Sequence, residues 1–219
     1  MDASLTQAFA LILLDRQKTD NTSLSFGVKP NCVILSIFFE LFINGNFDIN
    51  RKNQVMVKRP GIDLPEYQNS IYKRVSASIR PRSLQHWINS FHNSAASSSA
   101  VTEIMDCVVR DLQRRKLLCV NENQVYVADA DFLSSKISAI KKELTANAPV
   151  TDDILVLAAL MMRCHILKQY YSVPEKKQIK NRIRGIWQDR VFDQSEVTST
   201  TMEYDSLQVI LGAIFTVLE

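Results

Sequence analysis

The chain has 219 residues, of which 46% are hydrophobic and 22% are charged, and its formal net charge is +3. This balance is typical of a globular protein with a sizeable core, and so small a net charge does not by itself indicate a nucleic-acid partner. Four isolated cysteines form no C-x-x-C pair, which argues against a zinc knuckle and a disulfide framework and is typical of reduced, cytosolic thiols.

The first part of the chain is predicted to contain two apolar helices followed by a hairpin. Ser4 and Gln7 have the spacing of a capping box, and an apolar helix follows as far as Leu14. Asn31 is a suitable N-cap for a second helix, which is apolar on nearly all faces and is therefore expected to be buried. Alternating apolar residues over 47–57 then predict a β-hairpin.

Two amphipathic helices are expected next, followed by a Ser-rich connection. Asp63 and Glu66 are predicted to cap a helix that continues to Ile79, and Ser83 is predicted to cap the next helix. Residues 93–99 contain Ala and Ser but no large apolar side chain. We expect a flexible loop there, inside one domain rather than between two.

A basic helix that runs into a hairpin, over residues 101–129, is the most distinctive stretch of the sequence. Apolar residues recur at steps of three and four along the helix, and cations gather in its last turns, where they suit the negative end of the helix dipole. These cations are Arg110, Arg114, Arg115 and Lys116. The hairpin is predicted over 118–127. Its apolar side chains are Val120, Val125, Tyr126 and Val127. We expect this hairpin to pack against a second copy of the chain or to enter a lipid surface.

The rest of the chain is predicted to be helical. Further helices are expected from Leu133, Thr151, Pro174 and Leu207. Residues 155–167 are apolar on most faces, which predicts a central buried helix. Only five glycines and six prolines are present. Residues 1–219 are therefore predicted to form a mainly α, single-domain helical bundle with a buried central helix and two small β-hairpins.

No catalytic or metal-binding pattern is found in the sequence. It contains no glycine-rich nucleotide-binding motif and no nucleophile elbow. The three histidines, His86, His92 and His165, have no metal-ligand spacing. We therefore expect no enzymatic activity, no metal and no cofactor.

Positive charge and apolar character together suggest contact with a membrane surface. Basic residues cluster at 73–82, 110–116 and 176–184. The third cluster lies on an amphipathic helix, which could rest on anionic lipid or could simply be a solvated helix face. The longest apolar run, 154–162, is far shorter than the roughly 20 residues needed to cross a bilayer. No signal-peptide pattern opens the chain, so we expect a protein that lies on a membrane.

Several short motifs follow one another in the order found in a known family. They are Leu5-Thr6, Leu14-Asp15-Arg16, Thr22-Ser23, Glu40-Leu41, Asn44-Gly45, residues 84–88, the helix and hairpin through Tyr126 to Asp129, residues 154–167, Ile183-Arg184 and residues 207–215. In this order they resemble the Golgi phosphoprotein 3 family, and the resemblance extends almost from end to end.

The resemblance implies a helical bundle with hairpins, a peripheral membrane role and no catalysis. Family members are phosphatidylinositol 4-phosphate effectors of the Golgi. A similar protein would lie on the cytosolic face of Golgi membranes and act as an adaptor in vesicle trafficking and glycosyltransferase retention. The implied partners are this anionic lipid and the cytosolic tails of Golgi membrane proteins, and the 118–127 hairpin is a candidate for self-association.

The sequence departs from the family at its headgroup-binding positions. The resemblance places the family's tryptophan near residues 24–26 and its arginines at Ile34, Thr102 and Met105, so none of those arginines is present. The nearest substitutes, which we predict to form the headgroup site, are Phe26, Lys29, Arg110 and Arg114. The family's basic N-terminal arm, which engages the coatomer coat, has no counterpart before Leu5, so coat recruitment through that arm is not expected.

Two other interpretations remain open. The helix over 101–116 and the hairpin after it could imitate a winged helix, with its arginines on nucleic-acid phosphates. The long Ser-rich stretch before that helix is unfavourable for a winged helix, which needs a short turn. A family-like protein that has lost lipid binding would instead act as a protein-interaction scaffold.

Overall fold

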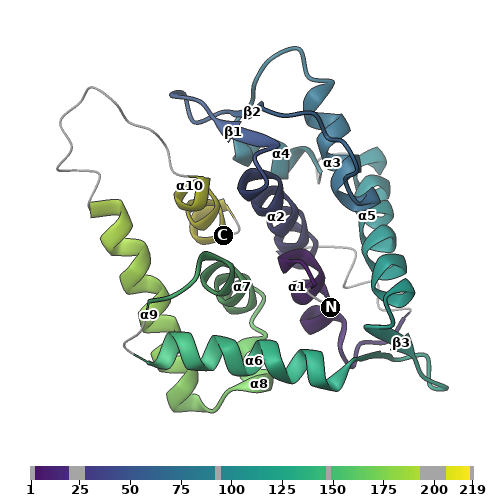
Figure 1. Cartoon of the computed structure of the whole chain (residues 1–219), viewed down its shortest axis with the longest axis vertical. Coiled ribbons are helices and arrows are strands. Elements are labelled where there is room, and N and C mark those ends of the chain that lie inside the picture. Colours follow the sequence, from purple (N-terminus) through teal and green to yellow (C-terminus); the bar gives the residue numbers. More distant parts are fainter. Residues whose placement is uncertain (1–2, 20–27, 92–94, 147–148, 193–205, 218–219) are drawn as a thin grey trace.

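The computed structural model describes residues 3–19, 28–91, 95–146, 149–192 and 206–217 (Figure 1). Within these ranges the chain forms ten α-helices, a final π-helical segment and two small antiparallel sheets. The helices are α1 (Leu5–Leu14), α2 (Val28–Ile43), α3 (Glu66–Ser76), α4 (Leu84–Ser90), α5 (Ala95–Arg114), α6 (Ala130–Thr145), α7 (Asp152–Arg163), α8 (Leu167–Tyr170), α9 (Val173–Phe192), α10 (Ser206–Gly212) and the π-helix η2 (Ala213–Val217). The strands are β1 (Phe47–Ile49), β2 (Val55–Val57), β3 (Leu118–Val120) and β4 (Tyr126–Ala128). The predicted mainly α bundle with two hairpins is confirmed.

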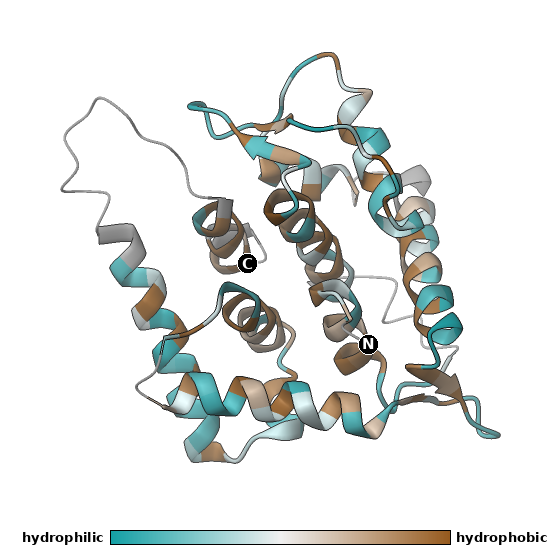
Figure 2. Cartoon of the chain, in the orientation of Figure 1, coloured by the Kyte–Doolittle hydropathy of each residue, from teal (hydrophilic) through white to brown (hydrophobic). Residues whose placement is uncertain are grey.

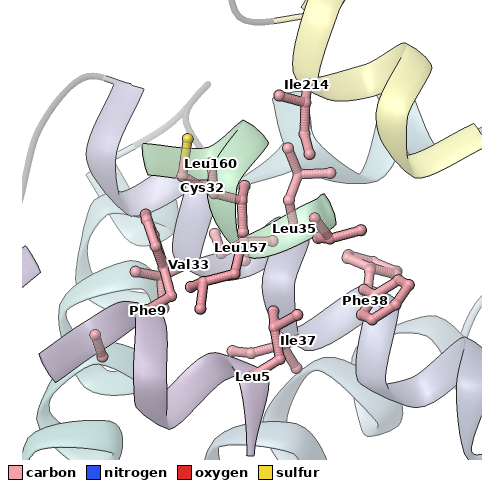
Figure 3. Packing of buried hydrophobic residues seen from close by; sticks show 14 of the residues in the cluster. Leu5, Phe9, Cys32, Val33, Leu35, Ile37, Phe38, Leu157, Leu160 and Ile214 are labelled. Atoms are coloured by element: carbon pink, nitrogen blue, oxygen red, sulfur yellow. The ribbon is translucent and has the colours of Figure 1, made fainter. Parts of the chain in front are cut away.

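The centre of the bundle is built from the most apolar helices, α1, α2 and α7, with α10 beside them (Figures 1 and 2). Every residue of α1 is buried, as is the stretch of α7 from Ile154 to Met161. Figure 3 shows side chains of these helices packed together, with Phe9, Leu35 and Leu157 among them. Helices that are apolar on most faces must be covered on most faces, so they occupy the middle and the amphipathic helices surround them.

The central helix was correctly predicted, but it ends earlier than expected. α7 stops at Arg163, with Cys164 as its C-cap, and His165 adopts a left-handed conformation with φ of 58°. Such a residue ends a right-handed helix, so the apolar residues that follow begin a separate short helix, α8.

The boundaries of α2 and α3 differ from those predicted. α2 begins at Val28, before the expected cap at Asn31, because Pro30 is tolerated in a first helical turn. α3 begins after Pro65, with no side-chain cap, and ends at Ser76, so Ile79 lies outside it. By contrast, Ser4 and Gln7 form the predicted capping box of α1.

The predicted flexible loop over 93–99 is wrong for residues 95–99, which form the first turns of α5. Residues 93 and 94 lie outside the described residues. Alanine has the highest helix propensity of all residues, and the propensity of serine is lower but still compatible with a helix. A sequence without large apolar side chains can therefore extend a helix whose later turns are held by packing.

Both hairpins form where alternation predicted them. β1 pairs with β2 in the register Phe47 with Val57, and β3 pairs with β4 in the register Leu118 with Ala128. β4 is also joined on its other edge by residues 16–19, where Arg16 N–H donates to the Tyr126 carbonyl at 2.9 Å and Tyr126 N–H donates to the Gln17 carbonyl at 2.8 Å. The segment after α1 therefore acts as an additional strand that fixes the second hairpin to the bundle.

Glu175, in the first turn of α9, forms hydrogen bonds and an ion pair that can be tested by substitution. Glu175 accepts hydrogen bonds from the Ser172 N–H and hydroxyl at 2.8 and 2.7 Å, and Lys141 of α6 lies 2.6 Å from its other oxygen. The Lys141 contact and then the Ser172 bonds lower the pKa of Glu175 to about 2. A carboxyl group whose pKa is lowered on folding stabilises the fold above its ordinary pKa of 4.5, and this contribution is lost as the pH falls towards 2.

We therefore expect Glu175→Gln to destabilise the protein at neutral pH but to have a progressively smaller effect as the solution is acidified. Urea unfolding at a series of pH values would measure the difference between wild type and variant. Glu122→Gln, at an exposed turn position of the second hairpin, is the control and should show no such trend. A difference for Glu175→Gln that stayed constant down to low pH would contradict the assigned contact.

Candidate functional site

A surface pocket lies between the start of α3 and the last turns of α5. It has a volume of about 460 Å³, within the range of small-ligand sites. It is lined by Leu64, Pro65, Glu66, Tyr67, Cys107, Arg110, Asp111 and Arg114. The structure thus brings together two of the predicted site residues, Arg110 and Arg114, in one pocket.

The amphipathic pattern of α5 explains why these arginines share a surface. Ile104, Val108 and Leu112 are buried, as their spacing predicted, so the opposite side of the helix faces solvent. Arg110 and Arg114 are four residues apart, which places them one turn apart on that side.

Each of the two arginines already has a carboxylate partner. Arg110 Nη2 lies 3.3 Å from Glu66 Oε2, at the start of α3, and this hydrogen bond raises the pKa of Arg110 above its ordinary value. Arg114 forms an ion pair with Asp111, and Arg115 Nε lies 3.3 Å from the other oxygen of Asp111. The lining therefore carries two cations and two carboxylates, and an anionic ligand would have to compete with the carboxylates.

A buried polar network lies behind the pocket. Gln7 of α1 donates to Asp111, and the hydroxyls of Ser4 and Tyr67 lie 3.3 Å apart. Glu40 of α2 accepts from the Thr6 N–H at 2.7 Å and from the Gln68 amide at 2.6 Å. The network joins α1, α2, α3 and α5, so it fixes the elements that carry the pocket.

Sequence reasoning missed this network, although one signal was present. Glu40 stands inside an apolar run from Phe38 to Phe42, where an ionisable residue needs partners once the helix is buried. Its partners come from two other elements, α1 and α3, and the sequence pattern of α2 does not identify them.

Of the other two predicted site residues, only Lys29 is described by the structure, and it lies away from the arginines. Lys29 is half-buried in the first turn of α2. It lies eleven residues before Glu40, about 16 Å along the helix axis, and Glu40 marks the end of α2 nearest the pocket network. Phe26 lies outside the described residues.

The positions where the resemblance placed arginines have different environments here. Ile34 and Met105 are buried in the core, whereas Thr102 is exposed on α5. Two of the three positions are therefore used for packing, and none supplies a cation.

The second hairpin, predicted to contact a membrane or a second copy, is only partly exposed. Val120 and Val127 are exposed, whereas Val125 and Tyr126 are half-buried. Because residues 16–19 occupy the outer edge of β4, that edge is not available to another chain. Contact of this hairpin with lipid or with a second copy stays a prediction.

Within the described ranges, no helix combines the length and the apolar character needed to cross a bilayer. In the same ranges, no group of three or more His, Cys, Asp or Glu side chains is arranged to hold a metal ion.

The fold and the pocket together define a helical bundle with a polar surface pocket that is fixed by a buried network. A family model described as Golgi phosphoprotein 3 (GPP34) matches residues 5–200. The chain therefore belongs to the Golgi phosphoprotein 3 family, as the order of its motifs indicated. A comparison with curated proteins finds no match.

Proposed function

We propose that this protein binds anionic phosphoinositide, specifically phosphatidylinositol 4-phosphate, at the cytosolic face of Golgi membranes. In this role it acts by binding rather than by catalysis, as a peripheral adaptor in vesicle trafficking and glycosyltransferase retention. The cytosolic tails of Golgi membrane proteins are its proposed protein partners. The observation that carries the proposal is the placement of Arg110 and Arg114 in one pocket of a Golgi phosphoprotein 3 family member.

A phosphate monoester has the chemistry to compete for these arginines. A guanidinium donates two parallel hydrogen bonds to phosphate, and a phosphate carries more negative charge than the carboxylate it replaces. Glu66 is exposed, and the pairing of exposed charges is weak, so the exchange at Arg110 costs little. Asp111 keeps Arg115 as a partner if Arg114 turns towards a ligand.

The paired state of the arginines also supports the scaffold alternative. If Glu66 and Asp111 hold them permanently, the pocket is neutral and the family's lipid function is lost in this chain. The winged-helix alternative is less well supported, because Arg110, Arg114 and Arg115 all have carboxylate partners and the second hairpin is held by residues 16–19.

We expect Arg110→Gln with Arg114→Gln to weaken co-sedimentation with vesicles that contain phosphatidylinositol 4-phosphate by roughly tenfold or more, because two charge-assisted contacts are lost. Glu66→Gln should strengthen it by roughly two- to fivefold, because it releases Arg110 from its competitor. Binding to phosphatidylserine vesicles of equal charge should change much less in both variants.

Lys177→Gln with Arg184→Gln is the matched control, since it removes two exposed cations from one face of α9. Equal binding of the wild type to the two lipids, with no effect of Glu66→Gln, would remove the headgroup pocket from the proposal. No binding of the wild type to either lipid at low salt would favour the scaffold.

A further inference from the structure

Exposed apolar side chains gather at the end of the molecule that carries the first hairpin. Five of the eight large hydrophobic side chains that are exposed in the described residues lie within 43–63 or 77–83. They are Ile43, Met56, Val57, Ile62 and Ile79. We call residues 43–63 and 77–83 the first-hairpin surface.

Backbone hydrogen bonds join the two segments of the first-hairpin surface. Val55 N–H donates to the Arg82 carbonyl at 2.8 Å, which links β2 to the connection between α3 and α4. The N–H groups of Lys58 and Arg59 both donate to the Asn46 carbonyl, which holds the chain after β2 against the end of α2. In Figure 1 these segments form one end of the molecule, opposite α6 and α8. Met56, Val57 and Ile79 therefore lie in segments that these bonds join, and Ile43 and Ile62 lie on the chain just before and just after the hairpin.

This region is also strongly basic. It contains six cations and two carboxylates, an excess greater than the net charge of +3 on the whole chain. One carboxylate, Asp48, is paired with Lys58 at 2.8 Å. Within the part of the chain that the structure describes, the other five cations form no ion pair; they are Arg51, Lys52, Arg59, Arg80 and Arg82. Unlike the pocket arginines, they can meet an anionic surface without first losing a partner.

The shape of the region favours a bilayer over a folded protein partner. Ile79 is 98% exposed and is followed directly by Arg80, and Ile62 is 73% exposed. A folded partner would need a matching pocket for each protruding side chain, whereas the interface of a bilayer accepts them without preformed cavities. Cations beside an inserted apolar side chain lie at the level of anionic headgroups.

We propose that the first-hairpin surface docks on anionic membranes, with Ile62 and Ile79 inserted into the interface and the unpaired cations among the headgroups. The inference rests on the proposed membrane function but not on the headgroup pocket. The first-hairpin surface ends at Asp63, and the next two residues, Leu64 and Pro65, line that pocket.

The test is co-sedimentation with vesicles of phosphatidylcholine containing phosphatidylserine. Ile62→Ser with Ile79→Ser should weaken binding by about tenfold or more, because two apolar side chains no longer enter the interface. Val173→Ser is the control, because Val173 is 72% exposed at the start of α9, outside the first-hairpin surface, and it should bind like wild type. Since the substituted side chains are exposed, the melting temperature should be unchanged.

A second experiment tests the charges with two double variants. One combines Arg80→Gln and Arg82→Gln in the first-hairpin surface, and the other, its control, combines Lys177→Gln and Arg184→Gln in α9. The first double variant should lose roughly tenfold in affinity, at about 1 kcal/mol for each cation near an anionic leaflet, and the second should lose little. The proposal would be overturned if vesicle binding were lost only in the α9 double variant, or only in the double variant Val120→Ser with Val127→Ser, because the membrane would then contact another face.

The outcomes also separate this inference from the headgroup pocket. If the Ile62→Ser, Ile79→Ser double variant loses binding and the wild type shows no preference for phosphatidylinositol 4-phosphate, the docking surface is supported and the headgroup pocket is ruled out. If the wild type prefers that lipid and the double variant binds as well as the wild type, the headgroup pocket is supported and membrane docking through the first-hairpin surface is overturned. No binding of the wild type to any anionic vesicle would overturn both.

Discussion

Truncation of Phe9 to alanine is expected to lower the free energy of unfolding by about 3–5 kcal/mol. Phe9 has no solvent exposure and lies in α1, which contacts α2, α5, α6 and α7. The substitution removes the apolar contacts of the ring and leaves a cavity that several helices would have to close together. Because α1 is covered by helices from both halves of the chain, the loss should appear as a lower midpoint of one cooperative transition.

Urea unfolding followed by circular dichroism would measure this change. Val173→Ala is the control, because an exposed substitution of this kind should change stability by about 0.5 kcal/mol or less. A loss of less than about 1 kcal/mol for Phe9→Ala would mean that α1 is not the packed centre that Figure 3 shows.

Removal of the buried carboxylate of Glu40 is expected to have a second large effect. Glu40→Ala leaves the Thr6 N–H and the Gln68 amide without their acceptor inside the bundle. Hydrogen bonds to a charged group contribute about 1.5–3 kcal/mol each, so we expect a loss of about 3 kcal/mol or more. Glu40→Gln keeps an acceptor oxygen and should cost much less. Equal losses for the two variants would indicate that packing, and not hydrogen bonding, is what Glu40 contributes.

The same residue should make stability depend on pH. Burial raises the pKa of Glu40 above its ordinary value of 4.5, and the hydrogen bonds from Ser4, Thr6 and Gln68 only partly oppose this. A carboxyl group whose pKa is raised on folding favours the fold while it is protonated, and this advantage is lost as the pH rises through its pKa in the folded state. We therefore expect wild type to lose stability relative to Glu40→Gln as the pH rises from 4.5 towards neutrality.

Unfolding free energies of both proteins across that pH range would test this. Glu103→Gln, on the exposed side of α5, is the control and should run parallel to wild type. A constant difference between wild type and Glu40→Gln at all pH values would contradict a raised pKa for Glu40.

Local patterns predicted most of the elements because those elements depend on local physics. The alternation of apolar residues over 47–57 and 118–127 was sufficient to locate both hairpins, and Ser4 with Gln7 located the start of α1. The all-round apolar character of α2 and α7 correctly predicted their burial. The errors fall at boundaries, as at residues 95–99, where weak propensities are decided by the rest of the helix.

The candidate site was less predictable, because charge partners are chosen by tertiary contacts. The sequence showed that Arg110 and Arg114 share a helix face, but Glu66 lies more than forty residues earlier, and only the packing of α3 on α5 brings it to Arg110. Lys29 was grouped with these arginines by sequence, whereas α2 carries it to the other end of that helix from Glu40.

The sequence by itself thus determined the fold class, the buried helices, the hairpins and the family, because periodicity and motif order are properties of the chain. Tertiary structure alone decided which cations are neutralised and which stay free. It paired Arg110 and Arg114 with carboxylates, whereas Arg80 and Arg82, next to the exposed Ile79, form no ion pair with any residue that the structure describes. Charges act through distance in space, and a one-dimensional pattern does not contain that distance.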